Sequence, residues 1–304
     1  MGLCFVLCFI STALGQSGQT VRTLRLKLSA GDLPSAESIL EVHRLEKGED
    51  AEYIQGIAWL ARGSLLVGDF TAASRYAKQA AALSKPYLKE SGAFDTAPEA
   101  VYALGTAIEV EAQCRLAAQG KREALQYLKN QQDTYSNAPI AFRSRLQKRW
   151  NLIGLEGTRA PDFTVEDHLG PLPPSLRELS GKPVVLFFWA EWCGHCKSQA
   201  AALRRVVEKY QPRGVEFVAP TRFYDSDRVS ERLKIEQVWR DSYPGLQSVS
   251  VPISEQAMLR YGVAATPTFV LLDRKGIVRL YSPTRMTEER LSGAIDGLLG
   301  TTKE

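Results

Sequence analysis

The sequence predicts a two-domain chain, an all-α, repeat-like helical domain followed by an α/β domain. Residues 19–153 are rich in Ala, Leu, Glu and Gln and repeat their apolar side chains at helical spacing. Residues 157–304 instead contain short apolar runs separated by Pro and Gly, which is typical of strands alternating with helices. The length of 304 residues agrees, since a domain averages about 150 residues.

Composition and charge exclude several classes of protein. The chain is 44% hydrophobic and 24% charged, with 23 Gly and 15 Pro. It is therefore neither a collagen nor a low-complexity, disordered or polytopic membrane protein. Lys and Arg number 38 against 34 Asp and Glu, a formal net charge of +4. A charge so small and evenly spread gives no electrostatic case for nucleic acid or an anionic membrane, so we expect no nucleic-acid partner.

The amino terminus resembles a secretory signal. Residues 1–14 form an apolar run without a charge, and Ala13-Leu14-Gly15 resembles a signal-peptidase site. A bilayer needs roughly 20 apolar residues, so the run predicts no stable transmembrane segment. We interpret residues 1–15 as a signal peptide and expect export to a bacterial periplasm or cell envelope. Because no Lys or Arg precedes the run, a start further upstream and a buried N-terminal helix are the alternatives.

A short signature recurs in the helical part, where a Gly-containing turn is followed by a small residue. It occurs as Gly31-Asp32-Leu33 with Ala36, as Gly68-Asp69-Phe70 with Ala73 and, more loosely, as Gly120-Lys121 with Ala124. Gly permits a left-handed turn and Ala lets paired helices approach closely, as a helical hairpin requires. Over residues 32–135 this resembles tetratricopeptide repeats, interrupted by an expected loop at 86–98. The resemblance implies a surface for a protein partner; a plain helical bundle is the alternative.

Five cysteines are present, and their positions predict different roles for them. Cys4 and Cys8 lie in the signal-like run and are absent from the mature protein if it is removed. Cys114 lies on an apolar helical stretch and is expected to be a buried, inert side chain. The other two, Cys193 and Cys196, form one Cys-x-x-Cys motif.

The α/β part surrounds this motif with regular elements. The run Val-Val-Leu-Phe-Phe-Trp-Ala before it predicts a strand buried on both faces. Pro267 stands at the entrance to another apolar strand, which predicts a special turn with a cis bond. The expected elements are, in order, a strand over residues 184–190, a helix ending near Tyr210, a strand over 215–219, the apolar strand that Pro267 enters, a hairpin turn at 274–276, a strand over 277–281 and a helix over 287–299.

The position of the motif, between a strand and a helix, indicates thiol chemistry. At a helix amino terminus, unsatisfied N–H groups and the helix dipole favour the thiolate, lowering a thiol pKa from about 8.5 to roughly 3.5–7.5. Cys193 is then the attacking residue, and Cys196, one helical turn on, resolves the mixed disulfide. His195 adds a polar donor between them. A zinc half-site is the alternative, but no second Cys-x-x-Cys exists and the only other histidines are His43 and His168.

Two motifs together resemble the thioredoxin fold. They are Trp192-Cys193-Gly194-His195-Cys196 and, downstream, Gly262-Val263 with Thr266-Pro267-Thr268-Phe269. The opening Ala160-Pro161-Asp162-Phe163 and an insertion at 222–250 are most similar to the membrane-anchored or periplasmic TlpA/ResA branch of the redoxin group. The resemblance covers residues 157–299 and implies a central sheet flanked by helices. It also implies a redox-active disulfide between Cys193 and Cys196, tuned by Trp192, Gly194 and His195, beside a cis Pro267 where the Thr266 backbone binds extended substrate chains.

The sequence departs from this family at its acidic positions. Phe187 stands where thioredoxins carry a buried Asp, and Gln199 stands where ResA-like proteins often carry a Glu. Glu191 is near but is expected to face solvent. We therefore expect no buried carboxylate to accept the Cys196 proton, and a slower, less pH-tuned exchange than in relatives that have the acid.

The insertion at 222–250 contains a predicted helix around 229–239 and three aromatic residues, Tyr224, Trp239 and Tyr243. One interpretation is a substrate-facing aromatic surface beside the disulfide. The alternative, which we favour, is a structural layer packed on the edge of the sheet.

These observations predict an exported thiol-disulfide oxidoreductase acting on protein thiols and disulfides, with a redox partner protein and a protein partner for the helical domain. No metal or organic cofactor is required. The alternatives are a peroxiredoxin-like thiol peroxidase, suggested by the residues at 160–163, and a helical-repeat binding scaffold with a secondary redox role.

Overall fold

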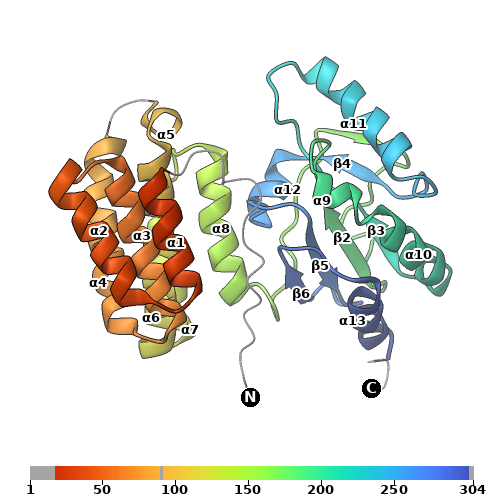
Figure 1. The fold of residues 1–304 in the computed structure, drawn as a ribbon. Helices are drawn as coiled ribbons and strands as arrows, with labels where there is room; N and C mark the ends of the chain where they lie inside the picture. Colours follow the sequence, from red (N-terminus) through yellow and green to blue (C-terminus); the bar gives the residue numbers. More distant parts are fainter. Residues whose placement is uncertain (1–17, 90–91, 301–304) are drawn as a thin grey trace. The chain divides into compact units, whose positions relative to one another are not determined.

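The computed structural model describes residues 18–89 and 92–300, which fall into two compact units, one ending at Phe142 and the other beginning at Arg143 (Figure 1). The signal-like run at residues 1–15 lies outside the described part of the chain. Among the described residues, no helix is long and apolar enough to cross a membrane.

The first unit is all helical, as the sequence predicts. Its helices pair in chain order, α1 with α2, α3 with α4 and α6 with α7. They are α1 (Gln19–Ser29), α2 (Leu33–Lys47), α3 (Ala51–Leu66), α4 (Phe70–Ser84), η1 (Lys85–Leu88), α5 (Ala93–Thr96), α6 (Pro98–Gln119), α7 (Lys121–Thr134) and the start of α8 (Ile140–Gly154). The expected loop at 86–98 instead contains η1 and α5. Pro86 and Pro98 lie within the first two positions of a helix, where the fixed φ of proline is tolerated.

The recurring glycine signature marks the turns of these three pairs. Gly31, Gly68 and Gly120 have φ of 76°, 80° and 90°, which a residue with a Cβ rarely adopts. The small residues that follow, Ala36, Ala73 and Ala124, are fully buried. In the first two turns the Asp after the Gly caps the second helix, its carboxylate accepting from the N–H of Ser35 or Ala72. The signature therefore encodes both the turn and the close approach of the paired helices.

The second unit is an α/β fold around a four-stranded sheet. The strand order is β3-β2-β5-β6, with β2 parallel to β3 and antiparallel to β5, and β5 antiparallel to β6. A separate pair, β1 with β4, is antiparallel. The strands are β1 (Asp167–Leu169), β2 (Val184–Phe188), β3 (Glu216–Val218), β4 (Val251–Ile253), β5 (Thr268–Leu272) and β6 (Val278–Ser282).

Helices bury both faces of β2, which explains its continuous apolar run. Val185 and Phe187 enter one core with residues of α10, α11 and α13, while Val184, Leu186 and Phe188 enter the other with Met258 and Tyr261. The helices of this unit are α9 (Gly194–Lys197), α10 (Ala200–Tyr210), η2 (Gln211–Arg213), α11 (Arg228–Ser242), α12 (Glu255–Arg260) and α13 (Glu288–Gly300), together with α8 from Arg143 onward. Thr287 caps α13, its Oγ1 accepting from the Arg290 N–H at 3.2 Å.

Candidate active site

The Cys-x-x-Cys motif follows the end of β2 through a tight turn. The Cys193 N–H donates to Ala190 O at 3.1 Å, which closes the turn and leads the chain into α9. Cys193 and Cys196 are joined in a disulfide, with their Cα atoms 5.3 Å apart. Cys193 is the N-cap of α9, and the Cys196 N–H lies 3.1 Å from its sulfur. That N–H is placed to stabilise a thiolate on Cys193 in the reduced protein.

The helix after Cys193 is shorter than the sequence predicts. α9 covers only Gly194–Lys197, and α10 begins at Ala200 after a break at Ser198 and Gln199. Because the effect of a helix dipole falls off within its first turn, the nearby N–H groups carry most of the stabilisation either way. The break therefore does not change how the Cys196 N–H can stabilise a Cys193 thiolate.

The second motif lies directly against the disulfide. β5 is antiparallel to β2, with Thr268 opposite Phe188, so the loop that enters β5 meets the turn that leaves β2. The Thr266–Pro267 peptide bond is cis, which confirms the expected turn. Thr266 O lies 3.5 Å from Cys193 Sγ. Two segments far apart in the sequence thus meet at one sulfur atom.

The motif exposes one side and shields the other. The Trp192 side chain is 57% exposed, and Gly194 and His195 are also exposed. Cys193 is 4% exposed, whereas Cys196 has no exposed surface. A substrate can therefore approach along Trp192 and Cys193, while Cys196 is reached through Cys193 alone.

The two departures from the family are both accommodated by packing. Phe187 is buried in β2, with its ring 5.1 Å from that of Phe269 and 6.1 Å from that of Tyr243. Gln199 accepts the Met286 N–H at 2.8 Å, which joins the start of α10 to the segment before α13. Neither position supplies an acid.

The expectation that Glu191 faces solvent is wrong. Its side chain is partly buried, and Oε2 is fully buried without a hydrogen-bond partner. Burial raises the pKa of the Glu191 carboxyl, a hydrogen bond from its own backbone N–H lowers it in part, and the nearby Glu231 carboxylate raises it again, so the net shift is upward. No local pattern predicts this effect, because Glu231 belongs to the insertion.

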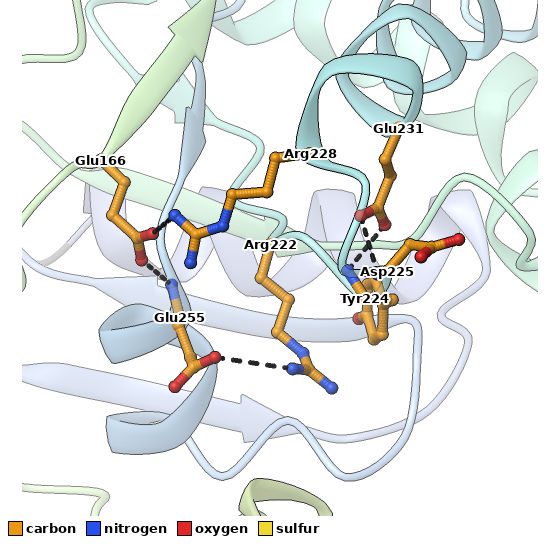
Figure 2. A network of polar contacts seen from close by, with 7 residues as sticks. All are labelled: Glu166, Arg222, Tyr224, Asp225, Arg228, Glu231 and Glu255. Carbon is orange, nitrogen blue, oxygen red and sulfur yellow. Dashed lines mark hydrogen bonds and ion pairs between the residues drawn. The ribbon is translucent and has the colours of Figure 1, made fainter.

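A network of polar contacts holds the start of this insertion (Figure 2). Glu231 of α11 accepts the N–H groups of Tyr224 and Asp225 at 2.6 and 2.8 Å. The Arg222 guanidinium lies 4.2 Å from the centre of the Tyr224 ring. The ring of Tyr224 meets that of Trp192 edge to face, with centroids 5.4 Å apart. The insertion therefore contacts the residue next to the nucleophile.

Further contacts tie the same network to neighbouring elements. Arg228 of α11 pairs with Glu166 at 3.3 Å, and Glu166 also accepts the Glu255 N–H at 2.9 Å. Arg222 lies 3.9 Å from the Glu255 carboxylate. These contacts hold the start of the insertion against α12 and the residues that lead into β1 (Figure 2).

The aromatic residues of the insertion divide between the two interpretations. Trp239 and Tyr243 are buried and stacked, with centroids 4.7 Å apart, and both pack on Trp189. They form a structural layer. Tyr224 alone touches the exposed Trp192.

Cys114 and His43, the other candidate residues of the helical unit, make contacts within that unit. Cys114 is 7% exposed, its thiol donates to Phe70 O, and burial raises its pKa. The His43 ring lies within hydrogen-bond distance of Thr20 and Asp50. Within residues 18–89 and 92–300, no group of three or more His, Cys, Asp or Glu residues is arranged to hold a metal ion.

Comparisons with known proteins agree with this geometry. Residues 157–281 match the AhpC/TSA family. The thiol-disulfide oxidoreductase ResA of Bacillus thuringiensis is 31% identical over 137 residues, covering 45% of this chain and 75% of that protein. The thioredoxin-like protein YneN of Bacillus subtilis is 26% identical over 159 residues, covering 48% of this chain and 88% of its own length.

A crystal structure of a thioredoxin-family thiol:disulfide interchange protein from Chlorobium tepidum covers 48% of this chain and 98% of its own, at 22% identity and a TM-score of 0.36. The family is assigned from the sequence relatives, which match the half of the chain that carries the disulfide. This chain belongs to the ResA-type thiol-disulfide oxidoreductases of the thioredoxin-fold redoxin group.

Proposed function

We propose that this oxidoreductase is exported and exchanges disulfides with protein substrates through Cys193 and Cys196. The observation that carries the proposal is the disulfide itself: its outer sulfur lies at a helix start, between the Cys196 N–H and Thr266 O. A sulfur so placed is stabilised as a thiolate and remains next to a backbone oxygen that can pair with an extended chain.

The exchange proceeds in two balanced steps. In the reduced protein the Cys193 thiolate attacks one sulfur of a substrate disulfide, forming a mixed disulfide and releasing one substrate thiolate. The Cys196 sulfur, after losing its proton, attacks Cys193 Sγ and releases the second substrate thiolate. The protein is oxidised to its disulfide and the substrate is reduced by two electrons. With an oxidised protein and a dithiol substrate, the same steps run in reverse.

The neighbouring residues have separate roles in this proposal. Trp192 provides exposed apolar surface for the substrate, and Gly194 leaves the approach to Cys193 free of a side chain. His195, exposed between the cysteines, adds a polar donor. Thr266 and Pro267 form the wall against which an extended substrate lies.

Export and partners complete the proposal. The apolar run at residues 1–14 supports secretion into a bacterial periplasm or cell envelope, where protein thiols and a redox partner protein are found together. Mass analysis of the mature protein purified from that compartment tests the export step. A chain beginning near residue 16 is expected; a full-length chain retained in the cytoplasm contradicts export.

A second candidate function, partner binding by the helical unit, has one supporting observation. A surface hollow of about 660 Å³ lies between α4 and α6, lined by Phe70, Arg75, Lys78, Glu111, Cys114 and Arg115 among others. If binding there is the main activity, a Cys193→Ser/Cys196→Ser variant retains function in cells. A thiol peroxidase is the remaining alternative, suggested by the AhpC/TSA match, and it requires peroxide consumption at the rate of dithiol turnover.

Trapping tests the main proposal directly. A Cys196→Ser variant cannot resolve the mixed disulfide, so substrates remain attached to Cys193 and can be identified by mass spectrometry. A Cys193→Ser/Cys196→Ser variant is the matched control and should capture nothing. Failure to recover any partner, together with no reduction of insulin disulfides, contradicts the proposal.

A further inference from the structure

Glu191 lies in the turn that carries the nucleophile, two residues before Cys193. The hydrogen bond from the Cys193 N–H to Ala190 O closes this turn, so the carboxyl and the sulfur belong to one short, fixed segment. Glu191 Oε2 is buried and has no hydrogen-bond partner. An ionised oxygen there loses its water without gaining a donor in return. A hydrogen bond from the backbone N–H of Glu191 to the same carboxyl favours the ionised form, but burial outweighs it, so the net effect favours the neutral acid.

The neighbouring charges strengthen this preference. Glu231 is 2% exposed, and each of its carboxylate oxygens accepts a backbone N–H, from Tyr224 or Asp225 (Figure 2). This fixed negative charge opposes a second one on Glu191.

Other groups facing Glu191 act in both directions. Lys234 on α11 and Lys197 on α9 favour its ionised form. The Tyr224 hydroxyl is neutral, since burial raises its pKa to about 12, and Arg222 lies over its ring. The insertion thus supplies most of the groups that set the charge of Glu191.

We propose that Glu191 is a positioning residue for Cys193, acting through the charge that it carries on the turn of the nucleophile. When Glu191 is neutral, the Cys193 thiolate faces the Cys196 N–H without a like charge on its own turn. When Glu191 releases its proton to solvent, the new carboxylate disfavours the thiolate and slows its attack. The burial of Glu191 and the Glu231 carboxylate of the insertion together keep the nucleophile reactive at a pH where an exposed Glu would oppose it. This inference rests on the proposed role of Cys193.

Alkylation of Cys193 tests the inference without a protein substrate. In a Cys196→Ser background, the folded protein is treated with iodoacetamide from about pH 4 to about pH 9, and the rate is followed as modification of the peptide that contains Cys193. With Glu191→Gln, the midpoint of the profile is expected to fall, and the rate below that midpoint to rise about threefold to tenfold. Glu208→Gln, which removes the same charge from an exposed position on α10, is the matched control and should leave the profile unchanged. An unchanged profile in Glu191→Gln overturns the inference.

A second variant separates the role of Glu191 from a direct effect on sulfur. Lys234 is exposed on α11, so Lys234→Gln should fold normally. Without the Lys234 charge, Glu191 keeps its proton to higher pH, so the inflection due to Glu191 in the alkylation profile moves to higher pH. In the Glu191→Gln background, Lys234→Gln should not produce this shift. Equal effects in both backgrounds overturn the inference. A protein that traps no substrate yet shows these shifts would lose the proposed function and keep the role of Glu191.

Discussion

The two units differ in how far apart in the sequence their decisive residues lie. In the helical unit, each turn is built by residues within six positions of one another, as in Gly31, Asp32 and Ala36. In the α/β unit, the surroundings of Cys193 come from its own turn, from the loop at Thr266 and from the insertion near Glu231. A local pattern can be predicted from the sequence. A site assembled from distant segments can be predicted only where each segment carries its own motif.

One buried cysteine from each unit gives the largest test of this comparison. Cys193→Ser removes the nucleophile, so the rate of insulin reduction is expected to fall by on the order of 10³ or more. Cys114→Ala removes a thiol from the helical unit, where burial raises its pKa, and should leave the rate within about twofold. Comparable losses in both variants would mean that the helical unit takes part in the chemistry.

A glycine in each unit gives the next test, on stability. At Gly262 a Cβ would lie 2.3 Å from the Lys148 N atom in α8, and φ is +59°, so Gly262→Ala should cost about 2–4 kcal/mol. At Gly31, φ is +76° but nothing lies within 4 Å, so Gly31→Ala should cost only about 1–2 kcal/mol. Chemical denaturation of each variant measures the difference. Equal costs would show that backbone conformation alone, without long-range packing, sets the requirement at Gly262.

These contrasts explain how much the sequence could predict. The cis Thr266–Pro267 bond, the strand before Cys193 and the turn at Gly68 each have a signature within a few residues. The raised pKa of Glu191 has none, since one of its causes, the Glu231 carboxylate, lies in an insertion far downstream. For Trp239 and Tyr243 the favoured prediction of a structural layer is confirmed, although an aromatic residue in an insertion can face either a substrate or a core.

The absence of an acid at Phe187 gives a smaller, kinetic test. Phe187 shares one core with Cys196, so Phe187→Asp places a carboxylate in the layer that contains the resolving sulfur. We expect the resolving step to quicken about tenfold relative to Phe187→Asn, which has the same shape without the base. Both variants lose about 3–5 kcal/mol from the truncated ring, so their difference, and not either alone, carries the test. Equal rates measured by rapid mixing would mean that no base is limiting.

The smallest expected effect concerns stability and pH at Glu191. Because burial and Glu231 raise the pKa of this carboxyl, the folded protein holds a proton over a pH range in which the unfolded chain has already released it. The stabilising contribution is therefore complete below the ordinary carboxyl range and is lost as pH rises through the folded-state pKa. Glu191→Gln removes this loss, so its Tm advantage over the parent should grow between about pH 4 and about pH 7.

The matched comparison is again Glu208→Gln, whose exposed position predicts a nearly constant Tm difference over the same range. A constant difference for Glu191→Gln would mean that its carboxyl is as well solvated in the fold as in the unfolded chain. A growing difference would show that the folded protein holds the Glu191 carboxyl in its neutral form over this pH range, as its burial and the nearby Glu231 carboxylate require.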